Sequence, residues 1–295
     1  MNLASPGAII CQLGPFTIRY YGVMIALGFV AALFCATRLA RKLSLSSETL
    51  VSLALYSFIF GIVGARLYYV LLSLDNFIGR PMEVFATWRG GLSIHGGIIG
   101  GVIAGCIYLR SQRKPILPYA DVMGACLPLA QAIGRWGNFF NSEAYGLPVT
   151  ADFPLRLYIP PGSRTLQYRL YDFFHPTFLY EAVWDLALFA YLYFYFAKKN
   201  RGMPGMTFFL YLSGYSVGRI LIEQLRIDSV SYFYSSPLPL LLSASTLVFS
   251  FSAMLHIYNK HHNEDVPVPA PAPVPAPTPE PEPATEEPSQ PDQMG

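Results

Sequence analysis

Residues 49–74 read TLVSLALYSFIFGIVGARLYYVLLSL, and the only charged residue among these 26 is Arg66. A helix needs about 20 mostly apolar residues to cross a bilayer, so this stretch is long enough to span a membrane. Stretches of the same kind recur along the chain, at residues 18–40, 92–109, 119–136, 177–197, 205–223 and 238–258. The sequence therefore predicts an all-α polytopic membrane protein with seven transmembrane helices.

The overall composition agrees with a membrane location. Hydrophobic residues make up 53% of the chain and charged residues only 13%, whereas a soluble globular protein carries about 25% charged residues. This argues against a soluble enzyme, a secreted disulfide scaffold and a nucleic-acid-binding protein. The four cysteines show no CxxC spacing, so we interpret them as packing residues, and we expect neither a metal nor another cofactor.

The positions of the basic residues predict the orientation of the helices. Connections that follow the first, third and fifth apolar stretches are rich in Lys and Arg, which gather on the cytoplasmic side of membrane proteins. These connections hold Arg38, Arg41, Lys42, Arg110, Arg113, Lys114, Lys198, Lys199 and Arg201. We therefore expect the N-terminus outside and the C-terminus in the cytoplasm. The long segment 138–176 is then an external loop subdomain.

The last 32 residues differ from the rest of the chain. Residues 264–295 contain seven acidic residues, no Lys or Arg, and eleven of the 25 prolines. Such a composition cannot bury an apolar core, so we predict a disordered Pro/Glu-rich cytoplasmic tail. Residues 1–263, with 20 basic and 11 acidic residues, form the predicted membrane domain and carry a formal net charge of +9.

Several polar side chains fall inside apolar stretches, where charge is costly and often functional. On the stretch 205–223, Tyr215, Arg219 and Glu223 recur at a spacing of four, and Arg226 continues the same helical stripe. One interpretation is an Arg219–Glu223 pair that neutralises itself. The other is a site for an anionic ligand, because Arg66, Arg135 and Arg219 have no one-for-one acidic partners along the chain.

Two further motifs carry groups suited to chemistry. In GLSIHGGIIGGVIAG, residues 91–105, the glycines indicate close helix packing, and His95 is either a hydrogen-bonded packing residue or a proton acceptor. In GRWGNFFNSEAYG, residues 134–146, an arginine, two carboxamides and a carboxylate lie within nine residues. These donors suit a phosphate or a developing anion, although asparagines can also cap a helix end.

The motif HPTFLYE at residues 175–181 opens the fifth apolar stretch. Glu181 and Asp185 stand four residues apart within that stretch and, with His95 and His175, could suggest a metal site. No HExxH or comparable ligand spacing accompanies them, so we do not expect a metal.

Residues 134–146 resemble the signature of the prolipoprotein diacylglyceryl transferase family, G-R-x-G-N-F-x-N-x-E-x-x-G, at each fixed position. The resemblance extends over roughly residues 10–258. Two residues, Trp136 and Phe178, depart from the family pattern, where we expect a small aliphatic residue and Gln. The other matching motifs are Tyr20-Tyr21-Gly22, GAR at 64–66, HGG at 95–97, HP[ST]xLYE at 175–181 and the Tyr215/Arg219/Glu223/Arg226 stripe.

The resemblance implies a multi-pass enzyme of the bacterial inner membrane with its active site toward the outer half of the bilayer. Such enzymes transfer the diacylglyceryl group of phosphatidylglycerol to the lipobox cysteine thiol of a prolipoprotein signal peptide. The reaction forms a thioether, releases glycerol phosphate and is the first step of lipoprotein maturation.

On this basis each candidate residue receives an expected role. Arg135 and Arg219 hold the lipid phosphate, while His95 either takes the thiol proton or only orients the lipid. The expected catalytic residues are His95, Arg135, Arg219 and Tyr215. The expected substrate-binding residues are Arg135, Asn138, Asn141, Glu143, Gly146 (for backbone clearance), Tyr21 and Arg66 (along the lipid path), Glu223 and Arg226. The alternatives are a transporter or channel for an anionic solute, an intramembrane metalloprotease and a non-catalytic lipid-binding assembly factor.

Overall fold

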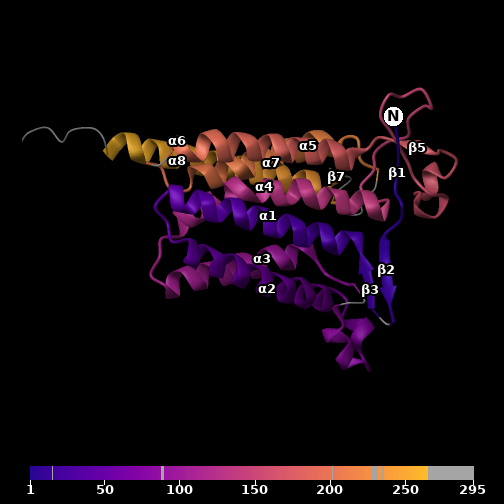
Figure 1. Cartoon of the computed structure of the whole chain (residues 1–295), viewed down its shortest axis with the longest axis horizontal. Helices are drawn as coiled ribbons and strands as arrows, with labels where there is room; N and C mark the ends of the chain where they lie inside the picture. The colour runs from indigo at the N-terminus through magenta and orange to yellow at the C-terminus, as the bar shows by residue number, and fades with distance from the viewer. Residues whose placement is uncertain (15, 88–89, 201, 228–231, 234–235, 265–295) are drawn as a thin grey trace, which may run out of the picture.

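The computed structural model describes residues 1–14, 16–87, 90–200, 202–227, 232–233 and 236–264 (Figure 1). Except for Glu264, the predicted tail lies outside the described residues. The long helices are α1 (Tyr20–Lys42), α2 (Ser47–Leu72), α3 (Ile94–Ser111), α4 (Ile116–Asn141), α5 (Thr177–Ala190), α7 (Met206–Glu223) and α8 (Leu238–Glu264). After α5 the chain continues through a π-helical turn (Tyr191–Phe196, η6) into α6 (Ala197–Lys199). A helix therefore forms at each of the seven predicted stretches.

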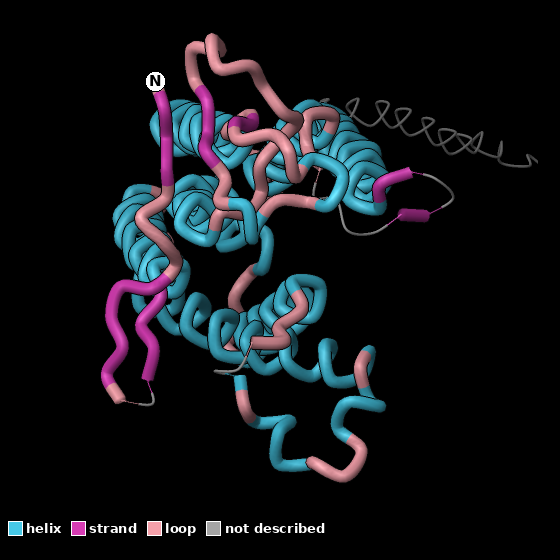
Figure 2. Tube along the Cα trace, turned by 90° about the vertical axis from the view of Figure 1, so that its right-hand side faces the viewer, coloured by secondary structure: helices cyan, strands magenta, loops and turns pink. Residues whose placement is uncertain are grey.

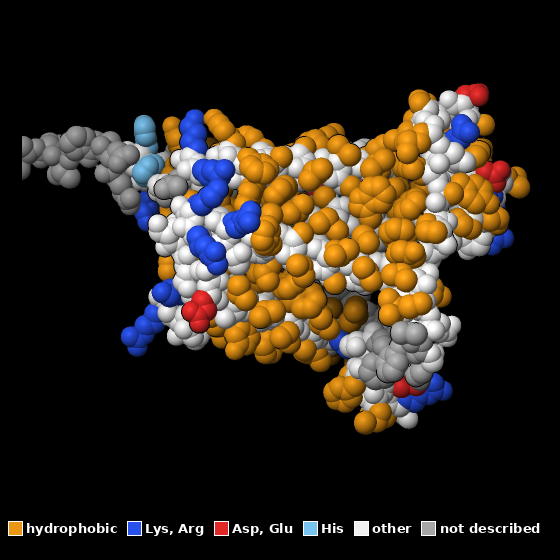
Figure 3. Space-filling view, in the orientation of Figure 1, with side chains coloured by type: hydrophobic (Ala, Val, Ile, Leu, Met, Phe, Trp, Pro, Cys, Tyr) orange, Lys and Arg blue, Asp and Glu red, His pale blue; other side chains and the backbone are white. Residues whose placement is uncertain are grey.

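Five of the described helices, α1 to α4 and α8, are long and apolar enough to cross a membrane. The other two predicted helices do not meet this criterion. Helix α5 by itself has only 14 residues, and α7 is less apolar because it carries Arg219 and Glu223. Figure 3 shows apolar side chains covering the flank of the helix bundle, with Lys and Arg gathered at the end where α6 lies. The chain is a mostly helical, polytopic membrane protein.

Helix α4 lies at the centre of the bundle. It packs against α1 on one side and against α5 and α7 on the other, while α8 packs on the outside of α7 (Figure 1). The α2–α3 hairpin forms a further layer beyond α1 (Figures 1 and 2). Its two helices approach so closely that a Cβ on Gly96 would lie 2.3 Å from the backbone oxygen of Gly64. Only a glycine therefore fits at this position.

Short strands lie at the end of the bundle opposite α6, which the all-α prediction did not include. Three of them form one sheet, in which β1 (Asn2–Ala4) pairs in parallel with β4 (Arg156–Tyr158), and β4 pairs antiparallel with β5 (Phe173–Phe174). The N-terminal segment is thereby joined to the predicted external segment (Figure 2). The remaining short elements are β2 (Ile9–Leu13), β3 (Phe16–Arg19), η1 (Leu74–Phe77), η2 (Pro81–Phe85), η4 (Pro161–Ser163), η5 (Leu166–Tyr168), β6 (Tyr232–Phe233) and β7 (Ser236–Pro237).

Buried apolar side chains form two clusters at different levels of the bundle. The larger includes Val122 and Ala125 of α4 and Leu192 of η6. The smaller lies toward the strands and includes Phe139 of α4 and Phe178 of α5. Trp136 and Phe178, the two departures from the family pattern, contact each other edge to face with ring centroids 5.7 Å apart. They are therefore a local change in packing.

Candidate functional site

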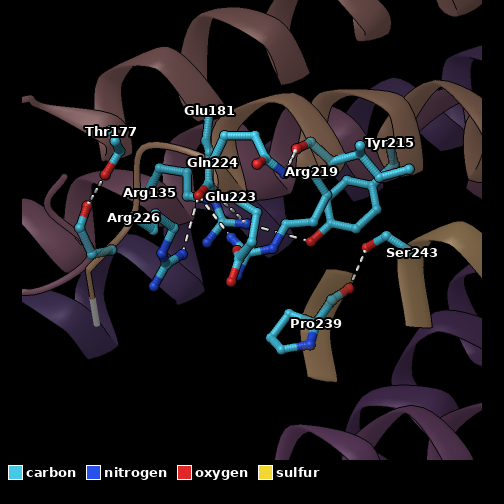
Figure 4. Close-up of polar contacts among 12 residues, drawn as sticks. Arg135, Thr177, Glu181, Tyr215, Arg219, Glu223, Gln224, Arg226, Pro239 and Ser243 are labelled. Atoms are coloured by element: carbon cyan, nitrogen blue, oxygen red, sulfur yellow. Dashed lines mark hydrogen bonds and ion pairs between the residues drawn. The ribbon is translucent and has the colours of Figure 1, made fainter. Parts of the chain in front are cut away.

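A buried carboxylate, Glu181 of α5, joins arginines from two other segments of the chain. Its Oε2 atom lies 2.6 Å from Arg135 Nη2 of α4, and its Oε1 atom accepts hydrogen bonds from Arg219 Nη1 of α7 at 2.8 Å and from Arg226 Nη1 at 3.1 Å (Figure 4). The Glu181 side chain is only 4% exposed. Three guanidinium groups from distant parts of the sequence thus converge on one carboxylate between the two apolar clusters.

The stripe on α7 completes this network. Arg219 Nη2 pairs with Glu223 Oε2 at 2.7 Å, one helical turn further along. The Tyr215 hydroxyl accepts a hydrogen bond from Arg135 Nη2 at 3.4 Å. The predicted common stripe of Tyr215, Arg219 and Glu223 is confirmed, and it faces α4 and α5. Arg226 was expected to continue the helical stripe, but α7 ends at Glu223, so Arg226 reaches Glu181 from the segment after the helix. We use the name arginine–carboxylate network for the set Arg135, Glu181, Tyr215, Arg219, Glu223 and Arg226.

The expectation that Arg135 and Arg219 have no one-for-one acidic partners along the chain did not take α5 into account. Their partner, Glu181, comes from a different helix, and Asp185 one turn further along α5 interacts electrostatically with both arginines. The ion pairs thus join three guanidinium groups to two carboxylates, Glu181 and Glu223, while the carboxyl group of Asp185 lies nearby. Sequence reasoning considered Glu181 and Asp185 only as metal ligands. Glu181 and Asp185 stand four residues apart on one helix, and Arg219 and Glu223 have the same spacing on another. This matched spacing was the feature of the sequence that could have predicted the pairing.

Beyond these ion pairs, the network retains one buried donor for an anion. The Nε atom of Arg135 is buried and has no hydrogen-bond partner among the described residues. Because a buried donor without a partner is unfavourable, such a group marks a place where a ligand or a water would gain binding energy. A planar guanidinium held in this way suits a phosphate, which accepts two parallel hydrogen bonds.

The end of α4 presents a second cluster, built around Glu143. Its Oε1 atom accepts hydrogen bonds from Asn138 Nδ2 at 2.8 Å and from Asn141 Nδ2 at 3.2 Å. Left-handed backbone conformations at Ser142 and Ala144, with φ of 54° and 55°, turn the chain back over the helix end. The exposed carboxylate of Glu143 is thus held by two asparagines that lie three and six residues beyond Arg135. We call Asn138, Asn141 and Glu143 the Glu143 clasp.

Tyr21, at the start of α1, lies between the arginine–carboxylate network and the Glu143 clasp. Its ring fills the space beside Gly137, where a Cβ would lie 2.7 Å from Tyr21 Cδ2. The phenol is also within electrostatic range of Glu143 and Arg135. Five predicted site residues from the signature and the first helix are therefore close together: Tyr21, Arg135, Asn138, Asn141 and Glu143.

Gly146 has a different role from the one expected. A Cβ at this position would lie 2.8 Å from Leu225 O and 2.9 Å from His175 Cβ, and the Gly146 N–H donates to His175 O at 2.9 Å. An isolated bridge also pairs Gly146 with Arg226. The close approach that this glycine permits is to the protein's own backbone, so it joins the segment after α4 to the end of α7.

Arg66 also differs from its expected place along the lipid path. Its guanidinium is largely buried and donates to backbone oxygens of residues 83–91 on the segment before α3. It also stacks on Tyr69 and Phe77, with Cζ 5.7 and 5.4 Å from the ring centroids. Its hydrogen-bonding capacity is thus used within the chain.

His95 is the second residue of α3 and belongs to the α2–α3 layer. Its side chain is exposed, and its ring makes a tilted contact with Tyr68 at 6.3 Å between centroids. Within the part of the chain that the structure describes, no contact joins it to the arginine–carboxylate network or to the Glu143 clasp. The structure therefore brings most of the site together around α4 and keeps the candidate base on a separate layer.

Comparison with known proteins identifies the family. The model of the prolipoprotein diacylglyceryl transferase family matches residues 8–258. Proteins named phosphatidylglycerol–prolipoprotein diacylglyceryl transferase are 42% identical in Trichormus variabilis, over 77% of this chain and 81% of the relative, and 43% identical in Thermotoga maritima, over 75% of each. The protein of that name in Staphylococcus aureus is 39% identical over 83% of this chain and 87% of the relative. The chain belongs to the prolipoprotein diacylglyceryl transferase family.

Proposed function

We propose that this protein transfers the diacylglyceryl group from phosphatidylglycerol to the lipobox cysteine thiol of a prolipoprotein. The observation that carries this proposal is the convergence of Arg135 and Arg219 on the buried carboxylate of Glu181. The names of the relatives give the same two substrates. The reaction yields a thioether on the cysteine and free glycerol phosphate, and it begins lipoprotein maturation.

The chemistry needs an anion site and a proton acceptor. The cysteine sulfur attacks the glyceryl carbon that carries the phosphate ester, a carbon–sulfur bond forms, and the carbon–oxygen bond breaks. The electron pair of that bond remains on the departing phosphate oxygen, and the thiol proton passes to a base. Arg135 and Arg219 stabilise the charge that grows on the phosphate. Glu181 keeps both guanidinium groups fixed before the substrate arrives.

The Glu143 clasp and Tyr21 bind the rest of the lipid head group. Glu143 is an acceptor whose orientation is fixed by Asn138 and Asn141, and it suits the hydroxyl groups of the glycerol head group. Tyr215 orients Arg135 through its hydroxyl oxygen. Glu223 and Arg226 hold Arg219 and Glu181 in place from the end of α7.

His95 takes the thiol proton in this proposal. An imidazole nitrogen can accept a proton, which suits a thiol that must be deprotonated to attack. Its exposed position on the α2–α3 layer leaves room for a peptide that enters from the membrane. The lipid then occupies the α4 side of the site and the peptide the α3 side.

The proposed topology is seven membrane crossings, with α5–α6 and α7 crossing beside α4. The basic residues near α6 face the cytoplasm, so the N-terminus and the strand-bearing end lie outside. This orientation places the Glu143 clasp and the arginine–carboxylate network in the outer half of the bacterial inner membrane. Phosphatidylglycerol and the signal peptide, together with the surrounding bilayer, are the partners in this proposal.

Reconstitution of the purified protein tests the function. Proteoliposomes with phosphatidylglycerol and a peptide containing a lipobox cysteine should yield a peptide whose mass increases by one diacylglyceryl group. Peptide in which Ser replaces that Cys should remain unmodified. Liposomes in which the lipid crosses the bilayer while the peptide mass stays constant would contradict the proposal and favour a transporter.

A further inference from the structure

Arg66 of α2 makes an unusual set of hydrogen bonds, all of them to backbone oxygens. Its Nε donates to Val84 O at 2.7 Å and its Nη2 to Glu83 O at 2.6 Å. Its Nη1 donates to Gly90 O at 2.7 Å and to Gly91 O at 2.9 Å. The side chain, in a residue only 8% exposed, therefore ties both ends of the segment 83–91 to one point on α2.

The carbonyls that Arg66 binds belong to two separate backbone features. Glu83 and Val84 lie in the last turn of η2, where Glu83 O also accepts a hydrogen bond from the Ala86 N–H at 3.1 Å. Gly90 and Gly91 adopt φ of 87° and 74°, which turns the chain toward α3. A lysine has three donors on a single atom and cannot reach both features at once.

The segment fixed by Arg66 leads directly into the first turn of α3, which carries His95. Two residues after Gly91, the Ser93 N–H donates to Ala65 O at 3.0 Å, so the start of α3 is also tied to the residue that precedes Arg66. His95 is then the second residue of the helix. The Tyr68 ring against His95 belongs to the same turn of α2 as Arg66.

We infer that Arg66 is a positioning residue for the reaction, and that it acts by fixing the turn at residues 90–91 so that α3 presents His95 to the thiol. This inference rests on the proposed function, because it takes His95 as the group that accepts the thiol proton. It assigns Arg66 no contact with the lipid. Loss of the guanidinium should therefore affect turnover and leave lipid binding unchanged.

A double-mutant cycle between Arg66 and His95 tests the inference. Arg66→Lys should lower kcat about 10- to 100-fold, the effect expected when a reacting group is misplaced by about 1 Å. The KM for phosphatidylglycerol should remain within about twofold of the wild-type value. In the His95→Gln background, measured by single-turnover assay, Arg66→Lys should lower the residual rate less than about threefold. Arg80→Lys, at an exposed position shortly before the segment 83–91, is the matched control and should leave kcat unchanged.

A second variant keeps the test informative if Arg66→Lys does not fold. Gly90→Ala places a Cβ in open space but strains the backbone at φ 87°, so it disturbs the turn without removing the arginine. It should show the same dependence on His95. The inference is overturned if Arg66→Lys or Gly90→Ala lowers the rate equally in both backgrounds, or if the KM for phosphatidylglycerol rises instead. Absence of transfer by the wild-type protein would overturn the proposed function itself, so the two failures are distinct.

Discussion

Replacement of Glu181 by Gln removes the charge that joins the three arginines. The three contacts of 2.6, 2.8 and 3.1 Å share one carboxylate that is 4% exposed. Removing one partner from a buried ion pair costs about 3–5 kcal/mol. Because Glu223 still pairs with Arg219 and Asp185 remains nearby, we expect the lower end of this range, about 3 kcal/mol of unfolding free energy.

The effect on the reaction should be comparable in size. Without Glu181, Arg135 and Arg219 repel each other and move apart. A displacement of about 1 Å in a group that binds the transition state can cost about 100-fold in rate, or about 2.7 kcal/mol. The measurement combines thermal unfolding in detergent with kcat/KM for transfer to a lipobox peptide. Glu181→Asp keeps the charge on a shorter side chain, so it should retain most of the stability yet still lose activity.

A matched control separates the buried network from ordinary surface pairs. Glu83 Oε1 lies 3.7 Å from Arg80 Nη1 on the surface, and the side chains of Glu83 and Arg80 are 37% and 73% exposed. Glu83→Gln should change stability by less than about 1 kcal/mol, because exposed pairs contribute little. The reasoning is refuted if Glu181→Gln has the same melting temperature as the wild-type protein and its kcat/KM stays within about threefold of the wild-type value.

Three further predictions concern single positions. Arg135→Lys should lower kcat/KM by at least about 10-fold, since an ammonium cannot reproduce the two-pronged guanidinium contact; transfer kinetics at wild-type rate would remove Arg135 from the phosphate site. Gly146→Ala should lower stability by about 1–3 kcal/mol through overpacking against Leu225 O and His175 Cβ, which thermal unfolding measures; an unchanged melting temperature would show that the backbone can shift. Burial lowers the pKa of His175, so the unfolded chain binds its proton more tightly and stability should fall as the pH drops below about 6.5; melting temperatures from pH 8 to 5 should decline less in His175→Gln, and equal slopes would contradict this assignment.

Apolar stretches predicted the helices well, because a membrane helix depends mainly on its own composition and length. Each predicted stretch became a helix, and the signature at residues 134–146 placed Arg135 and the Glu143 clasp on one helix end. Spacing within one helix is visible in a sequence. The common stripe of Tyr215, Arg219 and Glu223 was therefore predictable as well.

Contacts between helices were not predictable in the same way. The role of Glu181 depends on how α5 packs against α4 and α7, and nothing local to HPTFLYE specifies which arginines it meets. Arg66 was misinterpreted for the same reason, because its partners are backbone oxygens, which no side-chain pattern reveals. Gly146 was expected to leave room for lipid, yet the space beside it is filled by the end of α7.

The stoichiometry of a single turnover tests the central claim most directly. Wild-type protein in proteoliposomes, mixed with phosphatidylglycerol and a limiting amount of lipobox peptide, should release one glycerol phosphate for each thioether formed on the cysteine. Thioether formation without glycerol phosphate, or release of glycerol phosphate without a thioether, would contradict a direct transfer at the arginine–carboxylate network.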